Sequence, residues 1–67
     1  MELIINGNTH TVPSTVQTVS LLLEHLNIKH ESAIVEQNTE ILDKKTYTQQ
    51  AISDGDRLEI VHFVGGG

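Results

Sequence analysis

The sequence predicts a single α+β domain in which a mixed sheet of four or five strands packs on one helix. Short segments whose apolar residues alternate with period two occur at the start, in the middle and at the end of the chain. One segment, residues 18–27, instead has the period of an amphipathic helix. Because one helix covers only one face of a sheet, we expect the other face to meet water or a partner.

The first two strands are expected to form a hairpin. Met1, Leu3 and Ile5 alternate with other residues, which is the pattern of a strand with one buried face. The Asn-Gly-Asn sequence at 6–8 supplies a turn, because Asn and Gly tolerate positive φ angles. Residues 9–12 can then return as the second strand, which ends at the proline that follows because proline has no N–H to donate.

The helix is expected to begin after Thr18, whose side chain can cap it. Asn27 can take the left-handed position just beyond the last turn, with Ile28 folding back on the helix. A helix of roughly two turns is too short to be stable alone, so it must lie on the sheet. Its apolar residues recur at i, i+3, i+4 and i+7 and form one stripe: Val19, Leu22, Leu23 and Leu26.

The middle of the chain predicts two further strands. Residues 33–37 are apolar and β-branched at their start, and residues 41–42 form a short fourth extended piece after an Asn-Thr turn at 38–39. The segment 43–50 is polar apart from Tyr47. We expect this segment to wind through a tight turn or a 3₁₀ helix.

The last strand is expected at 57–63, after an Asp-Gly-Asp turn at 54–56. Leu58 and Ile60 share one face of it, and the opposite face holds Glu59, Val61 and Phe63. If the helix makes a β-α-β crossover, this strand can lie in mid-sheet, parallel to the first. The predicted core consists of Met1, Leu3, Ile5, Val12, Val19, Leu22, Leu23, Leu26, Val35, Leu42, Leu58 and Ile60.

Composition excludes several classes of function. The 67 residues carry a net charge of −5, and the four Lys and Arg residues are scattered, so nucleic-acid binding is not expected. There is no cysteine, and therefore no disulfide and no thiolate metal site. With no apolar run long enough to cross a bilayer and no signal peptide at the start, we expect a cytoplasmic protein that is monomeric when free.

Side chains suited to catalysis are few and dispersed. The four histidines lie far apart or at spacings that do not share a helix face, and the serines have no nucleophile motif around them. The Asp-Gly-Asp sequence at 54–56 lacks the further oxygen ligands of a calcium loop and is better explained as a turn. We therefore expect no bound metal or cofactor and no active site within the chain.

The sequence closes on Val64 and three glycines, which we expect to form a flexible tail at 65–67 after a folded domain at 1–64. Extended, the last four residues reach about 13 Å, and without β-carbons the glycines are narrow enough to enter a tunnel in another protein. The α-carboxylate of Gly67 is ionised at neutral pH and can attack the α-phosphorus of ATP. The resulting acyl adenylate can pass its acyl group to sulfur or nitrogen, with every catalytic group supplied by a partner.

Four stretches carry a resemblance to a known family: MELIINGN, QTVSLLLEHLN, VEQNTEI and DGDRLEIVHFVGGG. Over its whole length the chain resembles the ThiS family of sulfur carriers in thiamine biosynthesis, within the ubiquitin-like β-grasp superfamily. The resemblance implies a ThiF-type adenylating enzyme that uses ATP, a sulfur donor fed by a cysteine desulfurase, and thiazole synthase as the acceptor. It makes Gly67 the residue that is activated and thiocarboxylated, and Gly66 part of the terminal Gly-Gly pair.

A docking surface is expected beside the tail. Side chains on the outer face of the last strand and its neighbours can form an apolar patch with an acidic rim: Ile4, Ile34, Val61 and Phe63, with Glu2, Glu36 and Glu59 around them. Phe63 is the single phenylalanine and directly precedes the tail. The residues predicted to bind the partner are Ile4, Val61, Phe63, Val64 and Gly65.

Two other functions stay open on the sequence. The small subunit of molybdopterin synthase shares the fold and the terminal thiocarboxylate, although its chains usually run longer. A ubiquitin-like modifier, or a plain interaction module, belongs to a different class. A modifier would form isopeptide bonds with lysines, and an interaction module would tolerate loss of Gly67.

Overall fold

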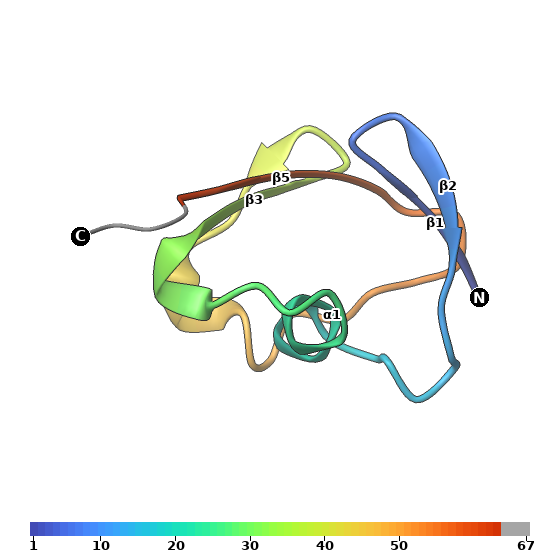
Figure 1. The fold of residues 1–67 in the computed structure, drawn as a ribbon, viewed down its shortest axis with the longest axis horizontal. Coiled ribbons are helices and arrows are strands. Elements are labelled where there is room, and N and C mark those ends of the chain that lie inside the picture. Colours follow the sequence, from blue (N-terminus) through green and yellow to red (C-terminus); the bar gives the residue numbers. More distant parts are fainter. Residues whose placement is uncertain (64–67) are drawn as a thin grey trace.

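The structure is a computed structural model of the chain, and it describes residues 1–63. A five-stranded mixed sheet curves over a single helix, as the sequence predicts (Figure 1). The strands lie in the order β2-β1-β5-β3-β4. Their bounds, with those of the helix and two 3₁₀ turns, are β1 Glu2–Ile5, β2 Asn8–Thr11, α1 Val19–His25, η1 His30–Ser32, β3 Ala33–Gln37, β4 Glu40–Ile41, η2 Lys44–Thr46 and β5 Arg57–His62.

The predicted division into a domain at 1–64 and a tail at 65–67 falls partly outside the described residues. The folded body is described up to Phe63. Val64 and the three glycines lie beyond that point.

The β1–β2 hairpin closes through the expected Asn-Gly turn. Asn6 and Gly7 have φ angles of 50° and 85°, so both central residues are left-handed, as a two-residue hairpin turn requires. The strands pair antiparallel, with Ile5 opposite Asn8. β2 therefore begins one residue earlier than predicted.

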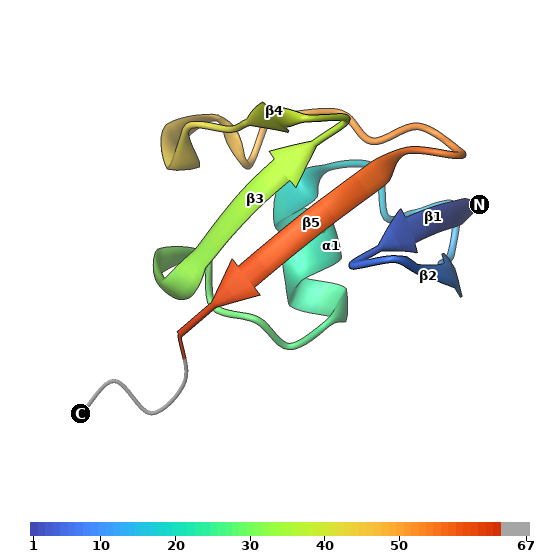
Figure 2. The same ribbon diagram turned by 90° about the horizontal axis from the view of Figure 1, so that it is seen from above.

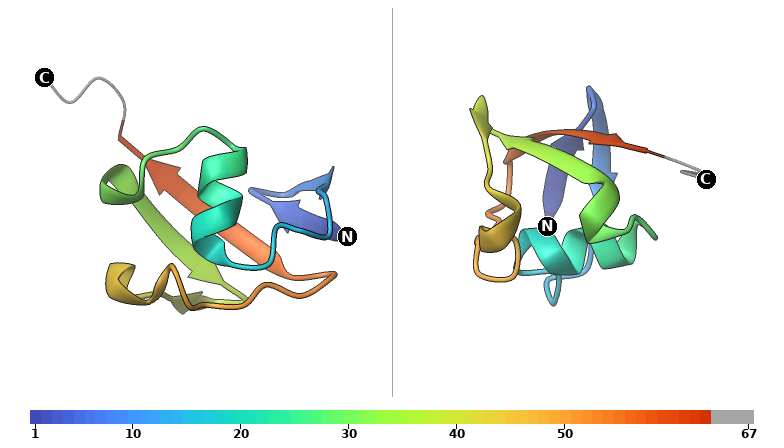
Figure 3. Two further views of the ribbon diagram at one scale, coloured as in Figure 1. Left: turned by 90° about the horizontal axis from the view of Figure 1, so that it is seen from below. Right: turned by 90° about the vertical axis from the view of Figure 1, so that its left-hand side faces the viewer.

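Helix α1 has both predicted caps. The Leu21 N–H donates to Thr18 Oγ1 at 3.2 Å, and beyond the helix Asn27 takes a φ of 60°. The Ile28 N–H then donates to the Leu23 carbonyl at 2.8 Å, which closes the last turn. The helix lies against the concave face of the sheet (Figure 3). Its residues Val19, Leu22 and Leu23 are buried in the core.

Strand β5 lies in the middle of the sheet, between β1 and β3 (Figure 2). It runs parallel to β1, with Ile4 opposite Arg57, and antiparallel to β3, with Val35 opposite Ile60. Leu58 is fully buried beneath it. The predicted crossover through the helix is therefore confirmed.

The core contains most of the predicted residues, and it extends further than predicted. Met1, Leu26 and Leu42 are only partly buried and pack against its rim, whereas the other predicted positions are buried. Residues that the sequence pattern missed are Val16, Ala33, Tyr47 and Ile52.

Tyr47 shows why the pattern failed. It lies in a polar segment, yet its ring is 1% exposed. Its hydroxyl donates to the Ala33 carbonyl at 2.9 Å and accepts from the Val35 N–H at 3.2 Å. The two-residue β4 pairs only with Glu36 and Gln37 of β3. Further along the same edge, the Tyr47 hydroxyl bonds the backbone of Ala33 and Val35, and these hydrogen bonds compensate for its burial.

Candidate functional site

The candidate site lies at the C-terminal end of β5. The last described contact of the chain is the N–H of Phe63, which donates to the Ser32 carbonyl at 3.0 Å. The main chain is therefore held by β3 as far as His62 and by Ser32, the last residue of η1, at Phe63. Of the predicted site residues, Gly67, Gly66, Gly65 and Val64 lie outside the described part of the chain.

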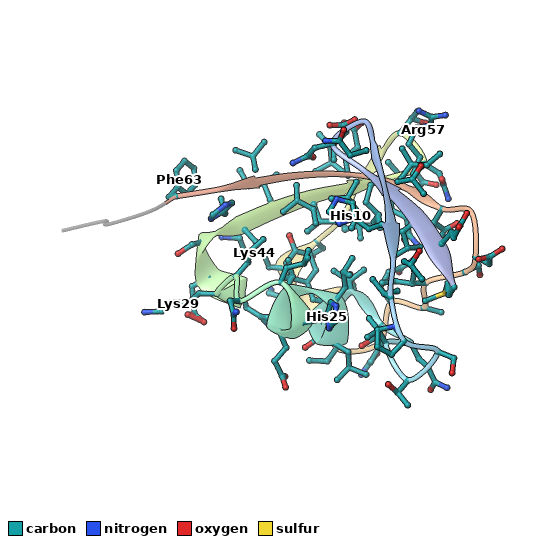
Figure 4. The ribbon with its side chains drawn as sticks, turned by 45° about the vertical axis from the view of Figure 1, so that its right-hand side comes forward. His10, His25, Lys29, Lys44, Arg57 and Phe63 are labelled. Atoms are coloured by element: carbon teal, nitrogen blue, oxygen red, sulfur yellow. The ribbon has the colours of Figure 1, made fainter. Side chains whose placement is uncertain are left out.

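Three exposed apolar side chains, which we call the outer cluster, surround this point: Ile34, Val61 and Phe63. Ile34 lies directly opposite Val61 across the β3–β5 pairing. Phe63 is 61% exposed and stands at the end of the described chain (Figure 4). The alternation of β5 thus places Val61 and Phe63 on the face away from α1, as predicted.

Ile4 does not join the outer cluster. It shares the outer face, but the β1–β5 register sets it opposite Arg57. Val61 is four residues further along β5, a distance of about 13 Å in a strand. The prediction that Ile4 lies with Ile34 beside the tail is therefore wrong. The face was predictable, whereas the register of a parallel pair depends on the crossover between its strands.

Two carboxylates face each other next to the outer cluster. Glu36 on β3 lies directly opposite Glu59 on β5, and Ile41 on the edge strand β4 lies on the other side of Glu36. Like charges opposite one another destabilise a sheet and favour a cation nearby. Glu2, the third predicted rim residue, pairs with Thr11 on β2 and is not part of this pair.

The Asp-Gly-Asp turn is occupied by internal contacts. Burial raises the pKa of the Asp56 carboxyl, but hydrogen bonds from the Ser53 N–H and from the Asn38 and Gln37 side chains outweigh it and hold the pKa below its ordinary value. Asp54 Oδ1 accepts from the Glu2 N–H at 2.6 Å. Both carboxylates therefore hold the start of β5, which agrees with a turn.

Among the histidines, His30 has a defined structural contact. Its Nε2 lies 2.7 Å from Ser20 Oγ. Its ring packs edge-on against the Tyr47 ring, with 5.9 Å between the two ring centroids. Within residues 1–63, no group of three His, Cys, Asp or Glu side chains is placed to hold a metal ion. No helix in that part of the chain is long and apolar enough to span a membrane.

Asn6 has a role beyond the turn that the sequence pattern does not indicate. Its side-chain amide contacts the backbone of Ile60, which is 54 residues away in the sequence. A turn asparagine is expected for its φ angle alone. No local signal indicates this contact, because it arises only when the crossover brings β1 beside β5.

Comparison with known proteins identifies relatives over the whole chain. The model of the ThiS family matches residues 3–67. The sulfur carrier protein ThiS of Bacillus subtilis is 38% identical over 94% of this chain and 96% of its own length. A thiazole synthase of Paramagnetospirillum magneticum is 45% identical over the full chain, which spans only 20% of that protein.

A solved structure agrees with the fold. The crystal structure of a thiamine biosynthesis protein (ThiS) from Geobacter metallireducens covers 100% of both chains, with a TM-score of 0.83 and 35% identity. At this TM-score and coverage, the similarity extends over the whole fold.

Proposed function

This chain belongs to the ThiS family, and on that premise we propose that it is the sulfur carrier for thiazole formation in thiamine biosynthesis. The observation that carries the proposal is the position of β5. This strand is central in the sheet, and the hydrogen bond from the Phe63 N–H to the Ser32 carbonyl holds the main chain to within four residues of Gly67. A carrier presents its C-terminus to an enzyme best when the strand before it is fixed in the folded domain.

The reaction takes place at the terminal carboxylate of Gly67. A carboxylate oxygen attacks the α-phosphorus of ATP, pyrophosphate leaves, and an acyl adenylate forms. A persulfide sulfur of the donor then displaces AMP and forms an acyl disulfide. A thiol reductant cleaves its S–S bond, so that the donor sulfur leaves in a disulfide with the reductant and the chain ends in a thiocarboxylate. ATP binds to the ThiF-type adenylating enzyme and the sulfur comes from a desulfurase, so the carrier itself needs no cofactor and no catalytic group.

The outer cluster is the proposed docking surface for the enzymes that act on Gly67. Val61 and Phe63 are 57% and 61% exposed, and both lie within a few residues of the reacting end. Val64 and Gly65 connect this surface to Gly66 and Gly67 and are proposed to contact the partner as well. Ile4, at the far end of the same face, takes part only where a partner covers the full length of β5.

Intact-mass analysis tests the proposal. The full chain is incubated with the adenylating enzyme, ATP and a sulfur source, and we expect its mass to rise by the difference between one sulfur and one oxygen. Fragmentation should place the change on Gly67, and a variant with one alanine added after Gly67 should gain nothing. An unchanged mass of the unextended chain contradicts the proposal.

Supplying the sulfurated chain to thiazole synthase completes the test. Loss of the added mass together with formation of the thiazole product is expected. Transfer to a molybdopterin precursor instead assigns the chain to that pathway. Isopeptide adducts on lysines would assign it to the protein modifiers.

A further inference from the structure

The two edges of β5 are paired to different lengths. Towards β3, pairing continues along the whole strand to Phe63. Towards β1, the Ile4 N–H donates to the Asp56 carbonyl and the Asn6 N–H to the Leu58 carbonyl, each at 2.9 Å. Since β1 ends at Ile5, its backbone pairs only with the first part of β5.

The Asn6 side chain continues this edge by one residue. The Ile60 N–H donates to Asn6 Oδ1 at 2.7 Å, and Asn6 Nδ2 donates to the Ile60 carbonyl at 3.1 Å. The amide thus supplies the acceptor and the donor that a further backbone residue of β1 would have supplied. Up to Ile60, therefore, this edge of β5 is closed.

The next residue on the same edge is His62. The N–H of Phe63 faces β3, where it bonds Ser32, and the backbone groups of successive residues alternate between the two edges of a strand. The N–H and C=O of His62 therefore face the side that β1 has left. Within residues 1–63, the pairing of β1 with β5 ends at Leu58, and no other strand pairs with that edge of β5.

We propose that this open edge receives an extended segment of the adenylating enzyme, which pairs with the backbone of His62 at the end of β5 and continues the sheet into the partner. The inference rests on the proposed function. Addition of a strand to an exposed edge is a common mode of peptide recognition, in which backbone hydrogen bonds give affinity and neighbouring side chains give specificity. Val61 and Phe63, on either side of His62, supply those apolar side chains.

The reach of the chain supports this occupant. Four residues extend about 13 Å, so an enzyme that reacts with Gly67 must bring its surface that close to Phe63. The adenylating enzyme is also the first to act, and an unmodified carboxylate carries no mark that distinguishes this chain from others. Recognition must therefore come from the carrier's surface beside its end, and pairing at His62 also aligns the chain towards Gly67.

Substituting His62 by proline tests the edge. His62→Pro removes the N–H that faces the open side. It leaves the hydrogen bond from the Phe63 N–H to Ser32 in place, because the N–H groups of these two residues face opposite edges. His62→Ala is the matched control, since it removes the imidazole and keeps the N–H. We expect His62→Pro to weaken binding to the adenylating enzyme by about fivefold or more and His62→Ala by less than about twofold. Equal affinities of the two variants would overturn the inference.

Hydrogen exchange of the unmodified chain gives a second test that does not depend on how a variant folds. The His62 amide should exchange rapidly in the free protein and become protected when the adenylating enzyme is added. The Phe63 amide, which already bonds Ser32, should be protected in both states. An unprotected His62 amide in the complex would refute the edge pairing.

The remaining outcomes are separable. If the His62 amide becomes protected only when thiazole synthase is added, the partner at this edge is thiazole synthase and not the adenylating enzyme. If protection grows with the concentration of the free chain, the partner is a second copy of the chain. If the chain gains sulfur while His62 stays unprotected, only the edge inference fails. If the chain binds with His62 protected and gains no sulfur, the proposed function fails instead.

Discussion

The two ends of β5 differ in almost every physical respect. At its start, Leu58 and Ile60 are buried against α1, and the backbone is paired on both sides, on one side by β3 and on the other by β1 and Asn6. At its end, Val61 and Phe63 are exposed, and the backbone is paired only on the side of β3 and Ser32. The difference shows how one strand can be anchored in the core at its start and exposed at its end.

The largest effect is expected at the anchor. Leu58→Ala leaves a cavity beneath the centre of the sheet, and it should lower the free energy of unfolding by about 2–5 kcal/mol. A small domain is marginally stable, so much of the variant should be unfolded at moderate denaturant. Val61→Ala on the same strand should change the free energy by less than about 0.5 kcal/mol. If urea titrations show the same loss of unfolding free energy for both variants, the two ends of β5 do not differ in their contribution to stability.

At the presented end, Phe63→Asp should spare folding and impair binding. The side chain is exposed, so thermal unfolding should stay nearly unchanged, whereas affinity for the adenylating enzyme should fall by about thirtyfold, as for an aromatic anchor. Ile41→Asp is the matched control, because Ile41 is 74% exposed on the edge strand β4, away from the end of β5. If calorimetric titrations show equal losses for both variants, the outer cluster is not the docking surface.

The junction between the two ends is set by Asn6. Asn6→Gly keeps the positive φ angle and removes both hydrogen bonds to Ile60, so it should lower the free energy of unfolding by about 1 kcal/mol. Asn27→Gly, at a φ of 60° beyond α1, is the matched control, because it makes the same substitution at a similar backbone angle. An Asn6→Gly variant no less stable than Asn27→Gly would show that the amide does not close this edge.

What the sequence predicted and what it missed also divides along β5. Period-two alternation was enough to place Leu58 inward and Phe63 outward, because the face of a residue is a local property. The position of Ile4 opposite Arg57 was not predictable, since it depends on how the helical crossover sets two distant strands side by side. Tyr47 was missed for a related reason, because its burial depends on the length of β4 and not on its polar neighbours.

The smallest effect concerns the carboxylates between the two ends. Glu59 lies directly opposite Glu36, so Glu59→Gln should raise the free energy of unfolding by about 0.2–1 kcal/mol, more at low salt than at high salt. Glu24→Gln removes the same charge from the exposed side of α1, where no such pairing exists, and should change stability less. Denaturant titrations at two salt concentrations compare the variants, and an equal gain from both would attribute the effect to net charge alone. A gain confined to Glu59→Gln would show that the free chain keeps a repulsive pair beside the proposed docking surface. A partner with a basic group next to its apolar contact can relieve that repulsion on binding.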